Sequence, residues 1–103
     1  MIGSPESCKN IDEIRLAIDT IDQQVVQLIG ERFKYVKVAS RFKVNEEAVK
    51  APERFKNMLL QRRVWAEVAG LNPDIIEKVY RDLVNHFISE EIKNWNIENG
   101  NKQ

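Results

Sequence analysis

The sequence has few of the residues that build covalently or metal-stabilised scaffolds. Among its 103 residues there is one cysteine, Cys8, and one histidine, His86. A lone cysteine cannot form an intramolecular disulfide, and one cysteine with one histidine cannot supply the four ligands of a structural zinc site. We therefore expect neither a disulfide framework nor a metal site. Cys8 and Ser40 have no visible base partner, so nothing favours nucleophilic catalysis.

Long hydrophobic runs and an excess of one charge are also missing. No uncharged apolar stretch reaches the length of a membrane span. The first residues, from Met1 to Glu6, lack the basic region and apolar core of a signal peptide. Sixteen Lys and Arg balance sixteen Asp and Glu, whereas nucleic-acid binders usually show a basic excess. We expect a small soluble cytoplasmic protein with no nucleic-acid or membrane partner.

Helix periodicity is the strongest pattern that the sequence does have. Between Ile11 and Lys43 there is no proline and one glycine, and apolar residues recur mostly at intervals of three and four. Prolines open two later segments, at Pro52 and Pro73, as they often do at the first helical position. The pattern predicts a single all-α domain over 1–103. Its three helices span about 12–43, 52–69 and 73–95, with a polar connection over 44–51 and a polar tail that frays after residue 95.

The length of the first predicted helix indicates a partner. A helix over 12–43 would be about 48 Å long, whereas a compact chain of this size is about 33 Å across. Its apolar stripe runs the full length, so the overhanging part needs a cover. A second copy would supply it, which predicts an interlocked helical homodimer. The alternative is a break near Gly30 that folds the helix back into a monomeric bundle.

Three cations lie in or beside the apolar stripe of this helix. Arg32 and Lys43 point to the same side and lie about 16 Å apart along the axis, which leaves room for a small dianion between their long side chains. Arg15 lies about 25 Å from Arg32 on the same helix. One small molecule cannot touch both in one chain, but Arg15 of one copy can approach Arg32 of the other in an antiparallel pair.

Two further charged residues have unusual positions. Glu91 lies between Phe87 and Trp95 on the apolar side of its helix, and Arg54 lies in the first turn of the second helix. Buried charge without a partner is unfavourable, so such a cluster needs a reason. One interpretation is internal ion pairing, such as Glu91 with Lys43. The other is a cationic pocket for a small carboxylate, because arginine binds carboxylates through a bidentate fork. We expect Trp95 in the core.

The same residues stand in longer motifs that resemble a known family. These motifs are Ile11-Asp12-Glu13-Ile14-Arg15, Gly30-Glu31-Arg32, the stretch from Tyr35 to Lys43, Ala51-Pro52-Glu53-Arg54 and Trp65-Ala66-Glu67. With them the chain resembles the all-helical chorismate mutase family from about Pro5 to Trp95, and most of all its isochorismate-pyruvate lyase branch, which makes salicylate for siderophores.

The resemblance implies a fold and an activity. Family members are intertwined homodimers of three-helix protomers with two equivalent active sites. It implies conversion of isochorismate to salicylate and pyruvate by a pericyclic elimination, with weaker chorismate mutase activity and no cofactor. A dedicated chorismate mutase, which makes prephenate, is the alternative. A non-catalytic helical binding or regulatory dimer is a further one.

The resemblance also implies roles for individual residues. Arginines from both chains would bind the two carboxylates of the substrate: Arg15 from the other protomer, and Arg32 and Arg54 from the same chain. Lys43 would lie beside the ether oxygen and stabilise charge as the C–O bond breaks. Met58, one turn after Arg54, would line the pocket, and the 44–51 segment would act as a lid.

One position departs from the family pattern. The family usually has glutamine where this chain has Glu91, and that glutamine donates to the ether oxygen. A carboxylate cannot donate, so Glu91 would serve as a catalytic donor only when protonated. Burial favours the neutral acid, whereas Lys43 and the arginines favour the carboxylate. We hypothesise that activity improves at acidic pH and that Glu91→Gln flattens the profile.

Overall fold

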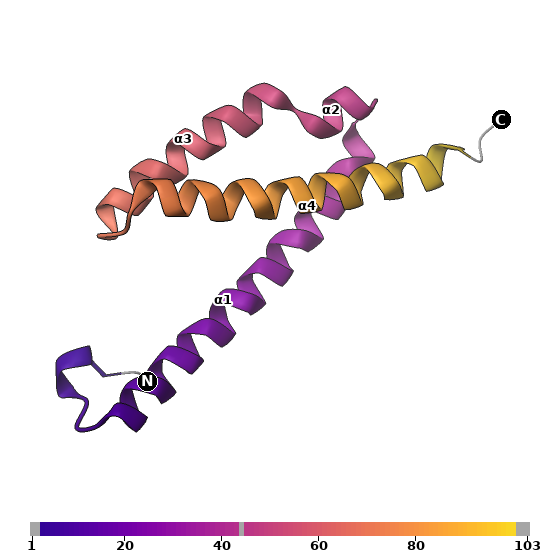
Figure 1. Cartoon of the computed structure of the whole chain (residues 1–103). Coiled ribbons are helices and arrows are strands. Elements are labelled where there is room, and N and C mark those ends of the chain that lie inside the picture. Colours follow the sequence, from indigo (N-terminus) through magenta and orange to yellow (C-terminus); the bar gives the residue numbers. More distant parts are fainter. Residues whose placement is uncertain (1–2, 44, 101–103) are drawn as a thin grey trace. The chain divides into compact units, whose positions relative to one another are not determined.

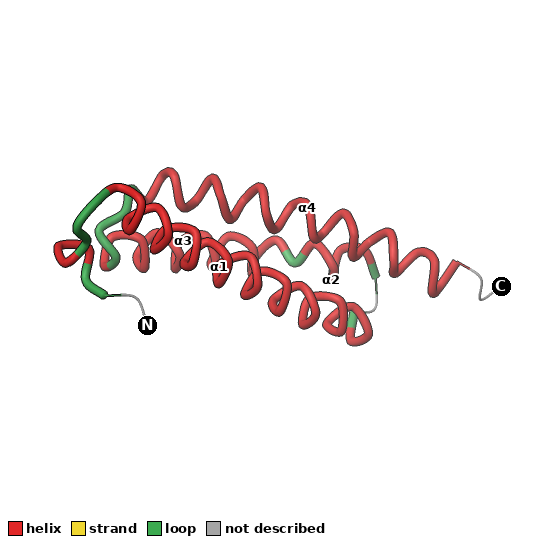
Figure 2. Tube along the Cα trace, turned by 90° about the horizontal axis from the view of Figure 1, so that it is seen from below, coloured by secondary structure: helices red, strands yellow, loops and turns green. Residues whose placement is uncertain are grey.

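Most of the described part of the chain is helical. A computed structural model describes residues 3–43 and 45–100, with side chains described as far as Ile97. No strand occurs within those ranges (Figure 2). The elements are a 3₁₀ turn over Pro5–Ser7, α1 over Ile11–Ala39, a 3₁₀ turn over Ser40–Phe42, α2 over Glu46–Lys50, α3 over Pro52–Val68 and α4 over Pro73–Gly100. The all-α prediction is confirmed.

The chain divides into two compact units, Met1–Tyr35 and Val36–Gln103, with the boundary inside α1. The first unit begins α1 with a well-formed cap. The Asn10 side-chain oxygen accepts a hydrogen bond from the Glu13 backbone at 2.9 Å, and the Glu13 carboxylate accepts one from the Lys9 backbone at 2.7 Å. This reciprocal arrangement resembles a capping box, which satisfies backbone donors that the first helical turn leaves free.

Helix α1 passes through Gly30 without a break (Figure 1). Its 29 residues correspond to about 44 Å. The alternative of a helix that folds back near Gly30 is therefore wrong. No residue of α1 is buried, and its apolar stripe stays exposed at Ile11, Ile14, Ile18, Ile21, Val25 and Leu28. A single amphipathic helix cannot cover its own apolar stripe.

Helix α1 ends four residues earlier than the sequence predicts. The hydroxyl of Ser40 donates to the Lys37 carbonyl oxygen at 2.7 Å, and the chain tightens into the 3₁₀ turn over Ser40–Phe42. Lys43 follows in an extended conformation, with φ −104° and ψ 136°. Serine hydroxyls compete in this way for backbone groups that the helix would otherwise use. Lys43 thus lies just beyond the helical part of the chain rather than on it.

The connection predicted as a loop contains a short helix, α2. The Asn45 side-chain oxygen accepts from the Ala48 backbone at 2.7 Å and so caps the helix. Val49 is buried, and α2 packs on α4. The loop prediction was wrong for 46–50 because one cap and one buried valine suffice when another helix supplies the contact surface. Val44, also part of the predicted loop, lies outside the described residues.

Helices α3 and α4 form an antiparallel hairpin, with Met58, Leu59 and Ala66 of α3 buried. Their junction follows a Schellman motif: Gly70 donates to the Glu67 carbonyl at 3.1 Å and Leu71 to the Ala66 carbonyl at 2.8 Å. Gly70 has φ 76°, a conformation that a Cβ would strain. The turn therefore depends on glycine at this position.

Ion pairs connect the start of α4 to α3. Arg63 donates to the Asp74 carboxylate at 2.8 Å and lies 3.5 Å from the Glu77 carboxylate. The hydrogen bond to Asp74 raises the pKa of Arg63 above its ordinary value. At its other end α4 continues to Gly100, five residues past the predicted end, so the polar tail is helical there instead of frayed. No helix in the described ranges is long and apolar enough to cross a membrane.

Candidate active site

The centre of the candidate site is an ion pair between residues far apart in the sequence. The Lys43 ammonium lies 2.7 Å from one carboxylate oxygen of Glu91 and 3.3 Å from the other. The Glu91 side chain is 3% exposed and the Lys43 side chain is 25% exposed. The Glu91 side chain is thus buried in the second unit, whereas the Lys43 side chain is partly exposed to solvent. The internal pairing considered from the sequence is present.

Helix α4 also holds the backbone of the same lysine. Trp95, one turn after Glu91, donates from its indole Nε1 to the Lys43 carbonyl oxygen at 3.3 Å. Two residues at i and i+4 lie on the same face of a helix, so one face of α4 contacts Lys43 twice. The sequence pattern predicted only a core position for Trp95. Its spacing of four from Glu91 was the available signal for a role beside Lys43.

The first turns of α3 carry two more predicted site residues. Arg54 is exposed, whereas Met58, four residues later, is 3% exposed. Among the described residues no ion pair engages the Arg54 guanidinium. Arg54 therefore offers an unneutralised cation, while Met58 contributes apolar packing beneath it.

The two remaining predicted residues belong to the first unit. Arg15 is exposed and Arg32 is half-buried. The Nη1 atom of Arg32 is shielded from solvent and has no hydrogen-bond partner among the residues described. Helix α1 keeps Arg15 and Arg32 about 25 Å apart along its axis. The structure therefore does not bring these two arginines together within one chain.

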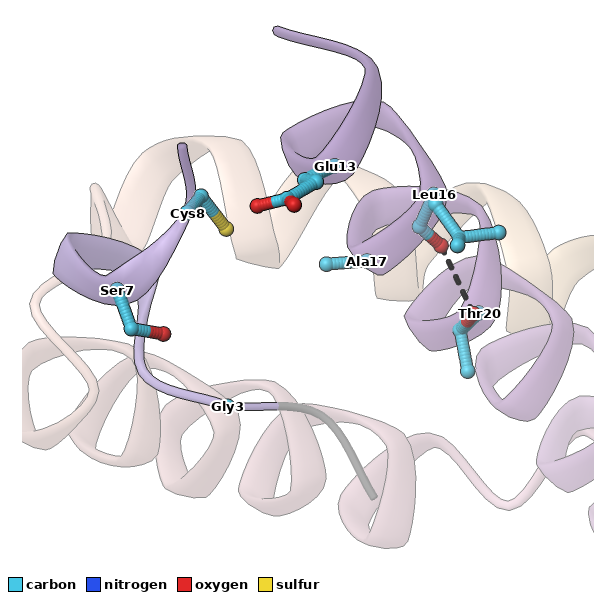
Figure 3. A pocket seen from close by; sticks show the side chains of 7 residues that line it. All are labelled: Gly3, Ser7, Cys8, Glu13, Leu16, Ala17 and Thr20. Atoms are coloured by element: carbon cyan, nitrogen blue, oxygen red, sulfur yellow. Dashed lines mark hydrogen bonds between the residues drawn. The ribbon is translucent and has the colours of Figure 1, made fainter. Parts of the chain in front are cut away.

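A pocket of about 320 Å³ lies elsewhere in the first unit. In Figure 3 the Cys8 thiol and the Glu13 carboxylate point toward each other across it. Thr20 does not offer its hydroxyl to this space, because that group donates to the Leu16 carbonyl oxygen at 2.8 Å. The pocket is lined by Gly3, Ser7, Cys8, Glu13, Leu16, Ala17 and Thr20. None of the predicted substrate-binding or catalytic residues is among them.

Comparison with known proteins adds an independent finding. The sequence profile of chorismate mutase type II matches residues 14–92. The chain is 44% identical over 97 residues to the isochorismate pyruvate lyase of Pseudomonas aeruginosa, covering 94% of this chain and 96% of that protein. It is also 34% identical over 87 residues to the T-protein of Haemophilus influenzae, but covers only 22% of that longer relative. A T-protein from Enterobacter agglomerans is 33% identical over 82 residues.

Proposed function

The chain belongs to the chorismate mutase type II family, and we propose that within it this protein acts in the cytoplasm as an isochorismate pyruvate lyase with weaker chorismate mutase activity. The observation that carries the proposal is the end-to-end similarity to a lyase, which covers 96% of that relative. The T-proteins match over about a fifth of their length. The match to the lyase is therefore the more extensive of the two.

In the proposed reaction, isochorismate gives salicylate and pyruvate in one pericyclic step. A ring hydrogen moves to the methylene carbon of the enolpyruvyl group while the ether C–O bond breaks, so no external proton, electron or nucleophile is consumed. Charge builds up on the ether oxygen as the bond breaks. A fixed cation at that oxygen lowers the barrier because it stabilises the transition state more than the ground state.

We assign the fixed cation to Lys43. Its ammonium lies 2.7 Å from the buried Glu91 carboxylate, and its side chain is 25% exposed, which leaves part of that side chain open to a ligand from the solvent side. Glu91 is the second catalytic residue in this proposal. When protonated it can donate to the ether oxygen, and when ionised it neutralises part of the Lys43 charge.

The two carboxylates of the substrate would be bound by arginines. The role of Arg54 is supported by its exposed side chain in the first turn of α3, which has no ion-pair partner among the described residues. Arg32 of the same chain and Arg15 of the other protomer complete the proposed set. Met58 would line the apolar side of the pocket, and the 44–51 segment, including α2, would close over the substrate as a lid. Positioning a flexible substrate in this way contributes to catalysis by itself.

The proposed active protein is a homodimer in which residues 1–103 form one domain. Its support is the unbroken α1 with an apolar stripe that stays exposed in the single chain. Apolar area of this kind stabilises association when a second copy covers it. Sedimentation analysis should give a dimer for the wild type. Val25→Glu, in the middle of the stripe, should give a monomer, whereas Glu31→Gln should remain dimeric; a monomeric wild type would contradict the dimer.

A dedicated chorismate mutase is the second candidate, favoured by the family match over 14–92. One assay separates the two. The purified protein is incubated with isochorismate and, separately, with chorismate, and the products are resolved by chromatography. Faster salicylate formation supports the lyase, and prephenate from chorismate with no salicylate from isochorismate supports the mutase. If the protein forms neither salicylate nor prephenate, both enzymatic proposals are contradicted and a non-catalytic dimer is left.

A further inference from the structure

Lys43 is contacted at two separate groups by one helix. Glu91 contacts its side-chain ammonium, and Trp95 donates to its main-chain carbonyl oxygen at 3.3 Å. The two α4 residues are four positions apart and so lie on one face of that helix. The first contact fixes the charged end of the lysine, and the second fixes the backbone from which its side chain starts.

The backbone at Lys43 needs such a contact. Lys43 lies beyond α1 and the 3₁₀ turn, in extended conformation. Its own N–H is bonded within the turn, to the Ser40 carbonyl at 3.2 Å. Its carbonyl oxygen therefore points outside the helical bonding pattern and is bonded by Trp95 instead. A lysine side chain has four rotatable bonds, so its ammonium position depends on how well the starting backbone is fixed.

We propose that Trp95 is a positioning residue for the reaction, because its indole N–H holds the Lys43 carbonyl and thereby places the Lys43 ammonium for catalysis. This inference rests on the proposed function, in which Lys43 is the cation at the ether oxygen. A displacement of about 1 Å at a catalytic group can lower the rate about a hundredfold. Loss of one hydrogen bond in the support is a smaller perturbation, and the expected effect is about tenfold.

The first test is kinetic. Trp95→Phe keeps an aromatic ring but removes the donor, and it should lower kcat about tenfold while KM changes less than twofold. Trp65→Phe is the matched control. Trp65 stacks against Arg62 at 4.5 Å on α3 and is half exposed, and its replacement should leave kcat unchanged. An unchanged kcat in Trp95→Phe would overturn the proposal.

A double-mutant cycle separates positioning from a general structural effect. In a Lys43→Ala background, Trp95→Phe should cause no further loss of kcat, because the group that Trp95 positions is gone. A full tenfold loss in that background would show that Trp95 acts by another route. If phenylalanine prevents folding, replacement of Trp95 by benzothienylalanine removes the N–H with nearly the same ring size and is expected to behave identically.

The last experiment does not depend on turnover. In protein labelled with ¹⁵N-lysine, the Lys43 ammonium should give a slowly exchanging NMR signal because it is paired with buried Glu91, and Lys43→Ala assigns that signal. The signal should be lost in Trp95→Phe and kept in Trp65→Phe. A wild type that makes neither product would refute the proposed function, while this measurement would still report on the contact between Trp95 and Lys43. A Lys43 signal unchanged by Trp95→Phe would refute the positioning role itself.

Discussion

The ammonium of Lys43 and the carboxylate of Glu91, 48 residues apart in the chain, form an ion pair of 2.7 Å. The two side chains differ in exposure, since the Glu91 side chain is 3% exposed and the Lys43 side chain is 25% exposed. In an enzyme that uses Lys43 as a cation, a buried carboxylate directly behind it reduces the charge that the substrate meets. The Glu91 carboxylate is therefore part of the electrostatics of the proposed active site.

Glu91→Gln should raise turnover. In the wild type the Glu91 carboxylate neutralises part of the Lys43 charge and, as a carboxylate, cannot donate to the ether oxygen. Glutamine donates a hydrogen bond and carries no charge, so the variant should exceed the wild-type rate. The measurement is initial salicylate formation in buffers of constant ionic strength.

Glu90→Gln is the matched control for this prediction. It removes a neighbouring carboxylate on α4 and should keep the wild-type rate. A Glu91→Gln rate no higher than that of the wild type would refute the role given to Glu91.

Arg54→Ala should weaken substrate binding without harming the fold. Arg54 is exposed and unpaired among the described residues, so its removal leaves no buried partner behind. A hydrogen bond to a charged group contributes about 1.5–3 kcal/mol, which corresponds to a rise in KM of about 10- to 100-fold. Steady-state kinetics gives KM, and Lys56→Ala on the same helix should leave it unchanged. Equal KM values for both variants would remove Arg54 from the site.

Two glycine substitutions should have opposite effects on stability. Gly70→Ala should lower the free energy of unfolding by about 1 kcal/mol, because alanine is strained at φ 76° in the α3–α4 turn. Gly30→Ala should raise it by about 0.5–1 kcal/mol, because Gly30 is in the interior of α1 and a Cβ there meets no described atom within 4 Å. Urea unfolding measures both. The same sign for both substitutions would contradict these backbone assignments.

Much of the fold could be predicted from local signals. The three-to-four spacing identified α1, and Pro52, Gly70 and Pro73 marked the ends of α3 and the start of α4 within one residue. The errors occurred where tertiary contacts decide. Val49 makes α2 a helix by packing in the second unit, and the Ser40 hydroxyl ends α1 early. Neither effect has a periodicity of its own in the sequence.

The candidate site was predictable in part for the same reason. Glu91 and Lys43 each interrupted an apolar stripe, and that shared anomaly was enough to suggest their pairing. The Trp95 contact was missed because it uses the Lys43 backbone carbonyl, whose direction depends on the end of α1. Side-chain patterns do not indicate where a backbone carbonyl points when the helix before it ends at an unpredicted residue.

The catalytic role of Lys43 is tested most directly by the rate at which Lys43→Ala makes salicylate from isochorismate. With the dimer intact by sedimentation, turnover should fall by two or more orders of magnitude, because the cation at the breaking C–O bond is lost. Lys78→Ala, which removes an exposed lysine of α4 paired only at 3.5 Å with Asp82, should retain wild-type turnover. Near-normal turnover in a dimeric Lys43→Ala protein would contradict the catalytic role proposed for Lys43.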